Sequence, residues 1–195
     1  SNAFWIEGRD QDGRLVHVQA MRLCHTGSSS LAELLPQQLA RAFGNSFDRA
    51  NGNICCPAAS ELRGRIAYHG DMWLSKSLRG KSLGITLGQI GLAACFAYWQ
   101  PDYVYGFAEA DVASKGVLFQ QGYWNCEPLN LEWKLCYPWL LQEDWLVWMN
   151  QKRLSYMVQI EHQKIGKEQR RHLCNQTAPG IHSADRKLVS AVRSA

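Results

Sequence analysis

The chain opens with two short strand-like runs that are rich in apolar residues. In residues 15–21, His17 and Gln19 stand between apolar neighbours, which is typical of a half-buried strand. Residues 4–7 form a similar apolar run, and residues 8–13 between the two are rich in glycine and aspartate. This pattern predicts an antiparallel β-hairpin.

The hydrophobic pattern of the rest of the chain alternates between helix and strand. Pro36 interrupts the first helical segment, because proline removes a helical N–H donor and clashes with the preceding turn. The remaining predicted elements are, in order, helices over 31–35 and 37–43 capped by serines 28–30, a loop over 44–60, a strand over 66–74, a helix over 83–99, a strand over 103–107, a helix over 112–121 ending at Gly122, strands over 123–124 and 129–137, and an apolar segment with helical spacing over 139–149. This order predicts a mixed α/β fold with a central sheet flanked by helices.

The predicted helix over 83–99 is apolar nearly all round, so we expect it to be buried on both sides. Gly84, Gly88 and Gly91 allow it to lie close to the sheet, and Gly70 marks a bulge or a close approach in the preceding strand. At about 17 residues the segment is marginal as a membrane span. We therefore expect a cytoplasmic protein that does not contact a membrane.

Charge and cysteine content narrow the class of protein. Seven cysteines form an odd set without a C-x-x-C pair, which favours free thiols in a reducing cytoplasm and predicts no metal site. Residues 150–195 carry nine Lys and Arg against three Asp and Glu, whereas residues 1–149 carry twelve against fourteen. The basic segment is interpreted as a solvated helix or a flexible end, with nucleic-acid binding as the alternative.

The loop between the strand over 66–74 and the helix over 83–99 is the strongest chemical signal. A glycine-containing turn that leads into a helix presents backbone N–H groups and the positive end of the helix dipole, which suit a phosphate group. Arg79 and Lys81 add positive charge at this place. The residues alone predict an anion site, because the loop has neither P-loop nor dinucleotide-binding spacing.

Four motifs in order resemble the GNAT family of acyltransferases. Its Arg/Gln-x-x-Gly-x-Gly/Ala signature is matched by residues 79–84, Arg-Gly-Lys-Ser-Leu-Gly. Residues 72–74 fall on the family's fourth strand, residues 101–106 on its splayed fifth strand, and Gly122-Tyr123 on its closing Gly-Phe/Tyr motif. The resemblance covers roughly residues 4–137. It implies a mixed, mostly antiparallel sheet with splayed strands, in which the family's first strand and helix are missing before the hairpin. We thus expect an acyltransferase domain over 4–149 followed by a basic extension over 150–195.

The resemblance implies acetyl-coenzyme A, or another acyl-coenzyme A, as the acyl donor. Ser82 stands where the signature usually has glycine. The residues implied for cofactor binding are Met72, Trp73, Leu74, Arg79, Gly80, Lys81, Ser82, Leu83 and Gly84.

The implied chemistry is direct attack by an amine on the acyl thioester, which needs a base for the ammonium and an acid for the thiolate. The candidates for the base are Asp71, His69, Glu109 and Asp111, and the candidates for the acid are Tyr123 and Tyr105. Asp111 stands where the family frequently has asparagine.

The family's usual acidic tyrosine is replaced by Leu118. The expected acceptor is a small-molecule or peptide amine. Whether the chain also forms a homodimer is left open. Leu118 leaves a catalytically silent coenzyme A-binding module as one alternative. The basic segment 150–195 leaves an RNA-directed acetyltransferase as another.

Overall fold

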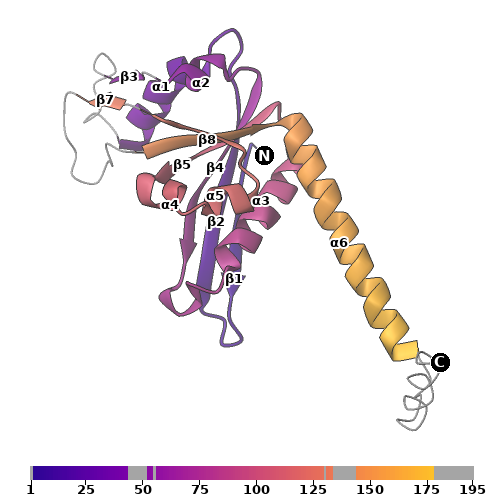
Figure 1. Cartoon of the computed structure of the whole chain (residues 1–195). Coiled ribbons are helices and arrows are strands. Elements are labelled where there is room, and N and C mark those ends of the chain that lie inside the picture. The colour runs from indigo at the N-terminus through magenta and orange to yellow at the C-terminus, as the bar shows by residue number, and fades with distance from the viewer. Residues whose placement is uncertain (1, 44–51, 55, 130, 134–143, 178–195) are drawn as a thin grey trace, which may run out of the picture. The chain divides into compact units, whose positions relative to one another are not determined.

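The computed structural model describes residues 2–43, 52–54, 56–129, 131–133 and 144–177. The chain divides into two compact units, Ser1–Tyr156 and Met157–Ala195. The elements in order are β1 (Ala3–Arg9), β2 (Leu15–His25), α1 (Leu31–Phe43), β3 (Gly52–Ile54), α2 (Pro57–Glu61), β4 (Arg65–Leu74), the 3-10 turn η2 (Lys76–Leu78), α3 (Leu83–Trp99), β5 (Tyr103–Glu109), α4 (Ala110–Ser114), α5 (Val117–Gln121), β6 (Asn125–Pro128), β7 (Leu131–Trp133), β8 (Asp144–Asn150) and α6 (Gln151–Thr177) (Figure 1).

The first unit is built on a six-stranded sheet in the order β1-β2-β4-β5-β8-β6, and β3 pairs with β7 in a separate two-stranded sheet. In the larger sheet only β4 and β5 run parallel, and the other neighbours are antiparallel. Helices flank this sheet (Figure 1). The predicted mixed, mostly antiparallel fold is confirmed.

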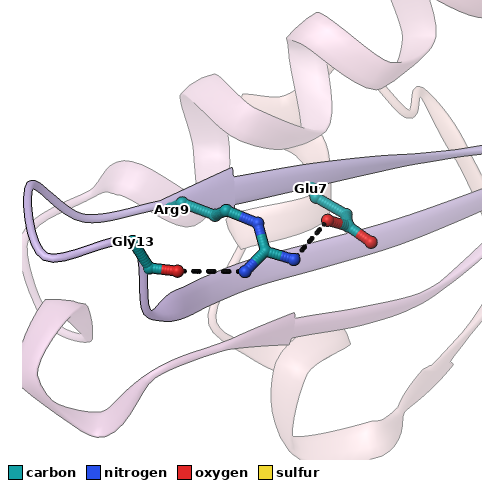
Figure 2. Close-up of polar contacts among 3 residues, drawn as sticks. All are labelled: Glu7, Arg9 and Gly13. Carbon is teal, nitrogen blue, oxygen red and sulfur yellow. Dashed lines mark hydrogen bonds and ion pairs between the residues drawn. The ribbon is translucent and has the colours of Figure 1, made fainter.

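The predicted hairpin is confirmed as β1 and β2, which pair antiparallel from Ala3 opposite Arg22 to Arg9 opposite Leu15. The Arg9 guanidinium holds the turn by donating to the Gly13 carbonyl and the Glu7 carboxylate, each at 2.9 Å (Figure 2). These groups lie on the surface, so the ion pair adds only a few tenths of a kcal/mol to about 1 kcal/mol of stability.

The two faces of the sheet are covered by different helices. On one face, α1 and α2 pack through Leu35 and Ala59 into a core that includes Ile66, Tyr105 and Leu146. Successive side chains of a strand point to opposite faces of the sheet, so the strand residues next to these core residues face the other side. There Gln19 Nε2 donates to the Leu87 carbonyl of α3 at 2.8 Å. The faces are called the α1 face and the α3 face below.

Two predictions before β4 are wrong. Pro36 lies inside one continuous helix, α1, which begins just after Ser30, whose N–H and hydroxyl both donate to the Glu33 carboxylate. The packing of Leu31 and Leu35 in the core stabilises this helix against the lost hydrogen bond. The expected loop over 44–60 contains β3 and α2. Pro57 stands in the first turn of α2, where a backbone N–H would have no acceptor within the helix, so its absence in proline costs no hydrogen bond. Residues 44–51 and 55 lie outside the described part.

The predicted helix over 83–99 is confirmed as α3, but its expected burial on both sides is wrong. Gly88, Gly91, Leu92, Cys95 and Trp99 are buried. The exposed fraction reaches 48% at Ile90 and 74% at Tyr98. The buried residues of the helix lie on one stripe, and an apolar composition by itself does not say which side is covered.

Three predictions after β5 are also corrected. The helix expected over 112–121 is two helices, α4 and α5, which are divided at Gly116 with a φ of 69°. The strand expected at 123–124 begins instead at Asn125. The apolar segment over 139–149 forms a strand, β8, where it is described. Because β8 lies between β5 and β6 with both faces covered, its apolar run lacks the period of two that marks a half-buried strand.

Other predictions end at the limits of the described part. The strand expected over 129–137 is seen as β7, and residues 134–143 lie outside the described residues. The basic segment forms helix α6 up to Thr177, and residues 178–195 lie outside the described residues, so nucleic-acid binding by this segment stays a prediction. Among the described residues, no helix has the length and apolar character needed to cross a membrane.

Candidate active site

The site is organised by the separation of β4 and β5. Ile66–Tyr68 pair with Tyr103–Tyr105, although β4 continues to Leu74 and β5 to Glu109. At Gly106 the strands still touch, since a Cβ there would lie 2.6 Å from the His69 carbonyl oxygen. The paired register ends one residue earlier, at Tyr68 and Tyr105, and the remaining residues of β4 and β5 do not pair with each other, as the splayed fifth strand of the resemblance implied.

Next to this opening, β4 carries a bulge. Val18 pairs with Trp73 and Ala20 with Gly70, so Asp71 and Met72 together lie opposite the single residue Gln19. Asp71 has a left-handed backbone with a φ of 53°, which is uncommon outside glycine. Gly70 was expected to mark a bulge or a close approach. The bulge lies one residue later, and the close approach is confirmed, because a Cβ at Gly70 would clash with the Tyr68 ring.

A cavity of about 520 Å³ lies on the α3 face of the opening. It is called the donor cavity after the role that we propose for it. The residues that line it come from β4, the loop before α3, the start of α3, β5, α4, α5, the segment between α5 and β6, and β8. They include nine of the predicted site residues, His69, Asp71, Met72, Trp73, Leu74, Arg79, Gly84, Glu109 and Tyr123.

The loop before α3 adopts an unusual backbone at the rim of the donor cavity. Gly80 has a φ of 74° and Ser82 a φ of 57°, and the Ser82 side chain does not cap the helix. The first N–H groups of α3 therefore have no side-chain cap from Ser82 and stay suited to an external anion. Arg79 Nε donates to the Leu74 carbonyl at 2.9 Å, which orients its guanidinium along the cavity wall.

A buried chain of hydrogen bonds runs from α3 to the donor cavity. Gln19 donates through Nε2 to Leu87, so its Oε1 is the atom that faces His69 Nε2 at 2.9 Å. His69 Nδ1 lies 2.7 Å from the Tyr123 hydroxyl. Since Oε1 can only accept, His69 carries its proton on Nε2, and Nδ1 accepts from Tyr123. The Tyr123 oxygen is thereby left with its lone pairs for the cavity.

Burial sets the protonation states of this hydrogen-bonded chain. Desolvation, followed by the charge of His17, lowers the pKa of His69 to about 4. Desolvation raises the pKa of Tyr123 well above its ordinary value. At neutral pH both groups are uncharged, so Tyr123 acts as a hydrogen-bonding group and keeps its proton.

A second cavity, of about 690 Å³, lies on the α1 face and is called the acceptor cavity after the role that we propose for it. It is lined mainly by aromatic and apolar residues of β1, β2, α1, β4 and β5. Asp71 and Phe107 line both cavities, so the two meet where β4 and β5 separate.

The other predicted site residues lie elsewhere. Gly80, Lys81, Ser82 and Leu83 belong to the loop and the first turn of α3 without lining the donor cavity. Asp111 is on α4, where its exposed carboxylate pairs with Lys115 at 3.3 Å. Tyr105 is fully buried and lines the acceptor cavity, on the opposite side from the donor cavity.

Three polar residues near the site were missed by the sequence interpretation. Gln19 was assigned only to a half-buried strand. Gln121 is buried and donates through Nε2 to the Gly84 carbonyl at 3.0 Å, which ties α5 to the start of α3. Asp144 pairs with Glu109 across β8 and β5, and burial together with the Glu109 charge raises its pKa to about 6. In the sequence only the polar character of these residues within apolar runs marks them.

Over the ranges given above, no three or more His, Cys, Asp and Glu side chains gather as a metal site would require. No protein-family model and no curated protein matches the sequence.

Solved structures do match. A chimera of spermidine N-acetyltransferase SpeG from Vibrio cholerae and hSSAT is 10% identical, covers 80% of this chain and 69% of its own, and has a TM-score of 0.48. ElaA from Escherichia coli is 15% identical over 77% and 70% of the two chains, with a TM-score of 0.43. A putative phosphinothricin N-acetyltransferase is 13% identical over 75% and 70%, with a TM-score of 0.41.

The chain is similar in fold to solved N-acetyltransferases. At identities this low and with TM-scores under 0.5, the likeness assigns neither an acceptor nor a catalytic residue, so the function is inferred from the chain's own cavities.

Proposed function

We propose that the chain is an N-acyltransferase that moves an acyl group, most simply acetyl, from coenzyme A to an amine. The observation that carries this proposal is the meeting of the donor and acceptor cavities between β4 and β5, with Asp71 in the lining of both. Two substrates that enter from opposite faces of the sheet would meet at this opening. A direct transfer needs such an arrangement, because it holds both reactants together without a covalent enzyme intermediate.

The donor cavity fits an acyl-coenzyme A in three respects. Its volume of about 520 Å³ admits a narrow pantetheine arm beside the unpaired edge of β4. The start of α3, with Arg79 and Lys81, offers N–H groups and positive charge to a pyrophosphate. Gly84 faces the cavity, and a Cβ there would meet only Met72 Cε at 3.9 Å, so the backbone of this turn is open to a ligand.

In the proposed reaction Asp71 accepts one proton from the incoming ammonium and passes it to solvent, to which it is exposed. The Tyr123 oxygen accepts a hydrogen bond from a second N–H and so orients the nitrogen lone pair. When bound, the thioester supplies the acyl carbon that the amine attacks. The carbon–nitrogen bond forms, the carbon–sulfur bond breaks, and the second nitrogen proton leaves with the thiol.

Titration calorimetry with acetyl-coenzyme A tests the donor half of the proposal. Arg79→Ala is expected to weaken binding about 10- to 100-fold, because a charge-assisted hydrogen bond contributes about 1.5–3 kcal/mol. Arg14→Ala is the matched control, since Arg14 lies exposed near the hairpin turn and should leave the affinity unchanged. Absence of binding, or equal affinity for both variants, would contradict the proposed site.

A coenzyme A-binding module without turnover is the second candidate. It is favoured by Leu118, which lines the donor cavity at the position where the resemblance implies a tyrosine. Thiol release from acetyl-coenzyme A over a panel of amines separates the candidates. Release that depends on the amine supports the transferase, whereas tight binding without release on any amine supports the module.

A further inference from the structure

The acceptor cavity has aromatic walls. Trp5, Tyr68, Tyr105 and Phe107 line it, and Ala20 adds a small side chain. Tyr68 lies 5.5 Å from Tyr105 and 5.9 Å from Phe107 between ring centroids. Trp5 is 71% exposed, which is unusual for so large an apolar side chain on a sheet. These walls suit an apolar or aromatic body.

A cation stands at one end of this cavity. Arg22 donates through Nη2 to Gln38 Oε1 at 3.0 Å, and its guanidinium lies 5.8 Å from the centroid of the Tyr68 ring. In the part of the chain that the structure describes, Arg22 forms no ion pair. A guanidinium has five N–H donors, so the bond to Gln38 leaves others for a planar anion.

An anion stands at the other end. Asp71 lies opposite Gln19, three residues along β2 from Arg22, which corresponds to about 10 Å at the rise of a strand. Tyr68 lies between the two charges, and both act on it. Burial first, and then the charge of Asp71, raises the pKa of Tyr68 to about 12, while Arg22 opposes this shift. The cavity is thus apolar in its middle and oppositely charged at its ends.

From this arrangement we infer the class of acceptor, which rests on the proposed transferase function. The acceptor is an amine with an apolar or aromatic body and a carboxylate, or a similar planar anion, at the end of the body remote from the nitrogen. The ammonium lies beside Asp71 at the opening to the donor cavity, and the carboxylate pairs with Arg22. A polyamine is disfavoured, because its second cation would stand next to Arg22.

Three probes of similar reach test this inference by titration calorimetry on the full chain. They are 3-[4-(aminomethyl)phenyl]propanoic acid, its primary amide, and spermidine. The acid is expected to bind at least 10-fold more tightly than the amide, and spermidine more weakly than both. Equal affinity of the acid and the amide, tighter binding of spermidine, or no binding of the acid would overturn the assignment.

Substitutions at Arg22 test whether this residue causes the preference for the acid. Arg22→Gln should remove the preference for the acid over the amide, and Arg22→Lys should retain part of it, because lysine keeps the charge without the planar fork. Arg14→Gln should leave the preference unchanged. If Arg22→Gln discriminates as the unchanged protein does, Arg22 is not the anion site. Urea unfolding confirms that each variant is folded.

The proposed donor site and the inferred acceptor class can fail separately. Binding of the acid in the absence of coenzyme A reports on the acceptor cavity alone. Binding of acetyl-coenzyme A, with its loss in Arg79→Ala, reports on the donor cavity alone. If the acid binds through Arg22 while acetyl-coenzyme A does not bind, the transferase function fails and the ligand class of the cavity stands. If acetyl-coenzyme A binds and the acid does not, only the acceptor class fails and the transferase function stands.

Discussion

The donor and acceptor cavities differ in what they are made of. The anion site proposed for the donor cavity is made of backbone, through the turn at Gly80 and Ser82 and the start of α3. The acceptor cavity is made of side chains, with Trp5, Arg22 and Tyr68 brought side by side from three strands. A site made from backbone needs a short stretch of suitable sequence, whereas a site made from side chains needs the assembled sheet. The first can therefore be recognised in the sequence and the second cannot.

The two tyrosines nearest the opening provide the strongest test of this difference, because Tyr123 faces the donor cavity and Tyr68 the acceptor cavity. Tyr123→Phe should lower kcat about 100-fold or more, since the attacking nitrogen loses the oxygen that orients it. Tyr68→Phe should change mainly the KM for the acceptor. Steady-state kinetics on an active amine measures both. Equal effects of the two substitutions on kcat would contradict the division of roles.

The buried histidine should make the donor side sensitive to acid. The pKa of His69 is about 4 in the folded protein against about 6.5 when unfolded, because burial disfavours its charged form. Below pH 6.5 the unfolded chain binds the proton and the folded protein does not. The free energy of unfolding should therefore fall by up to about 3 kcal/mol between pH 6.5 and 4, and this contribution should level off below pH 4.

Urea unfolding over this pH range measures the effect. His69→Gln should flatten the profile, whereas His25→Gln, at an exposed residue, should leave it as it is. An unchanged profile in His69→Gln would show that other groups are responsible.

The close contact between Gly106 of β5 and the His69 carbonyl of β4 can be tested by adding a methyl group at Gly106. In Gly106→Ala the new Cβ would lie 2.6 Å from the His69 carbonyl oxygen, and backbone cannot move away cheaply. The substitution should lower the free energy of unfolding by about 2 kcal/mol. Gly84→Ala is the control, because its Cβ has room and alanine favours a helix by up to about 1 kcal/mol. Similar stability of the two variants in urea unfolding would remove Gly106 as the point where the opening begins.

The smallest expected effect concerns Asp144, whose charge acts on Tyr68 in the acceptor cavity. Its pKa is raised to about 6 by burial and by Glu109, so its contribution to stability is present at low pH and lost as pH rises through 6. Asp144→Asn should stabilise the protein at pH 8 by up to about 1 kcal/mol, a value reduced because the group is half exposed, and by much less at pH 5. Urea unfolding at the two pH values checks this. Destabilisation at pH 8 would contradict it.

Much of the fold could be predicted from local sequence. The hairpin and α3 have clear signals, namely alternation around Gly13 and a long apolar run behind a glycine-containing loop. The errors fall where tertiary packing outweighs a local preference. Pro36 is accommodated because its helix is buried at Leu31 and Leu35, and β8 has a helix-like composition because it is covered on both faces.

The candidate site was predicted unevenly. The loop from Arg79 to Gly84 and the strand residues Met72–Leu74 could be located, because glycine and charge have local meaning before a helix. The hydrogen-bonded link from Gln19 through His69 to Tyr123 could not be predicted from the sequence. It joins residues 50 and 54 positions apart, and the tautomer of His69 follows only from how Gln19 is held by α3.

The sequence by itself determined the glycine-containing turn before α3, where we propose the anion site, because N–H groups, glycine and Arg79 need only neighbouring residues to form such a turn. The tertiary structure decided everything that depends on the separation of β4 and β5. It placed Asp71 in two cavities, turned the lone pairs of Tyr123 toward one, and set Arg22 and Asp71 at opposite ends of the other. These relations arise from strand pairing between distant segments, and strand pairing is fixed by the packing of the whole sheet.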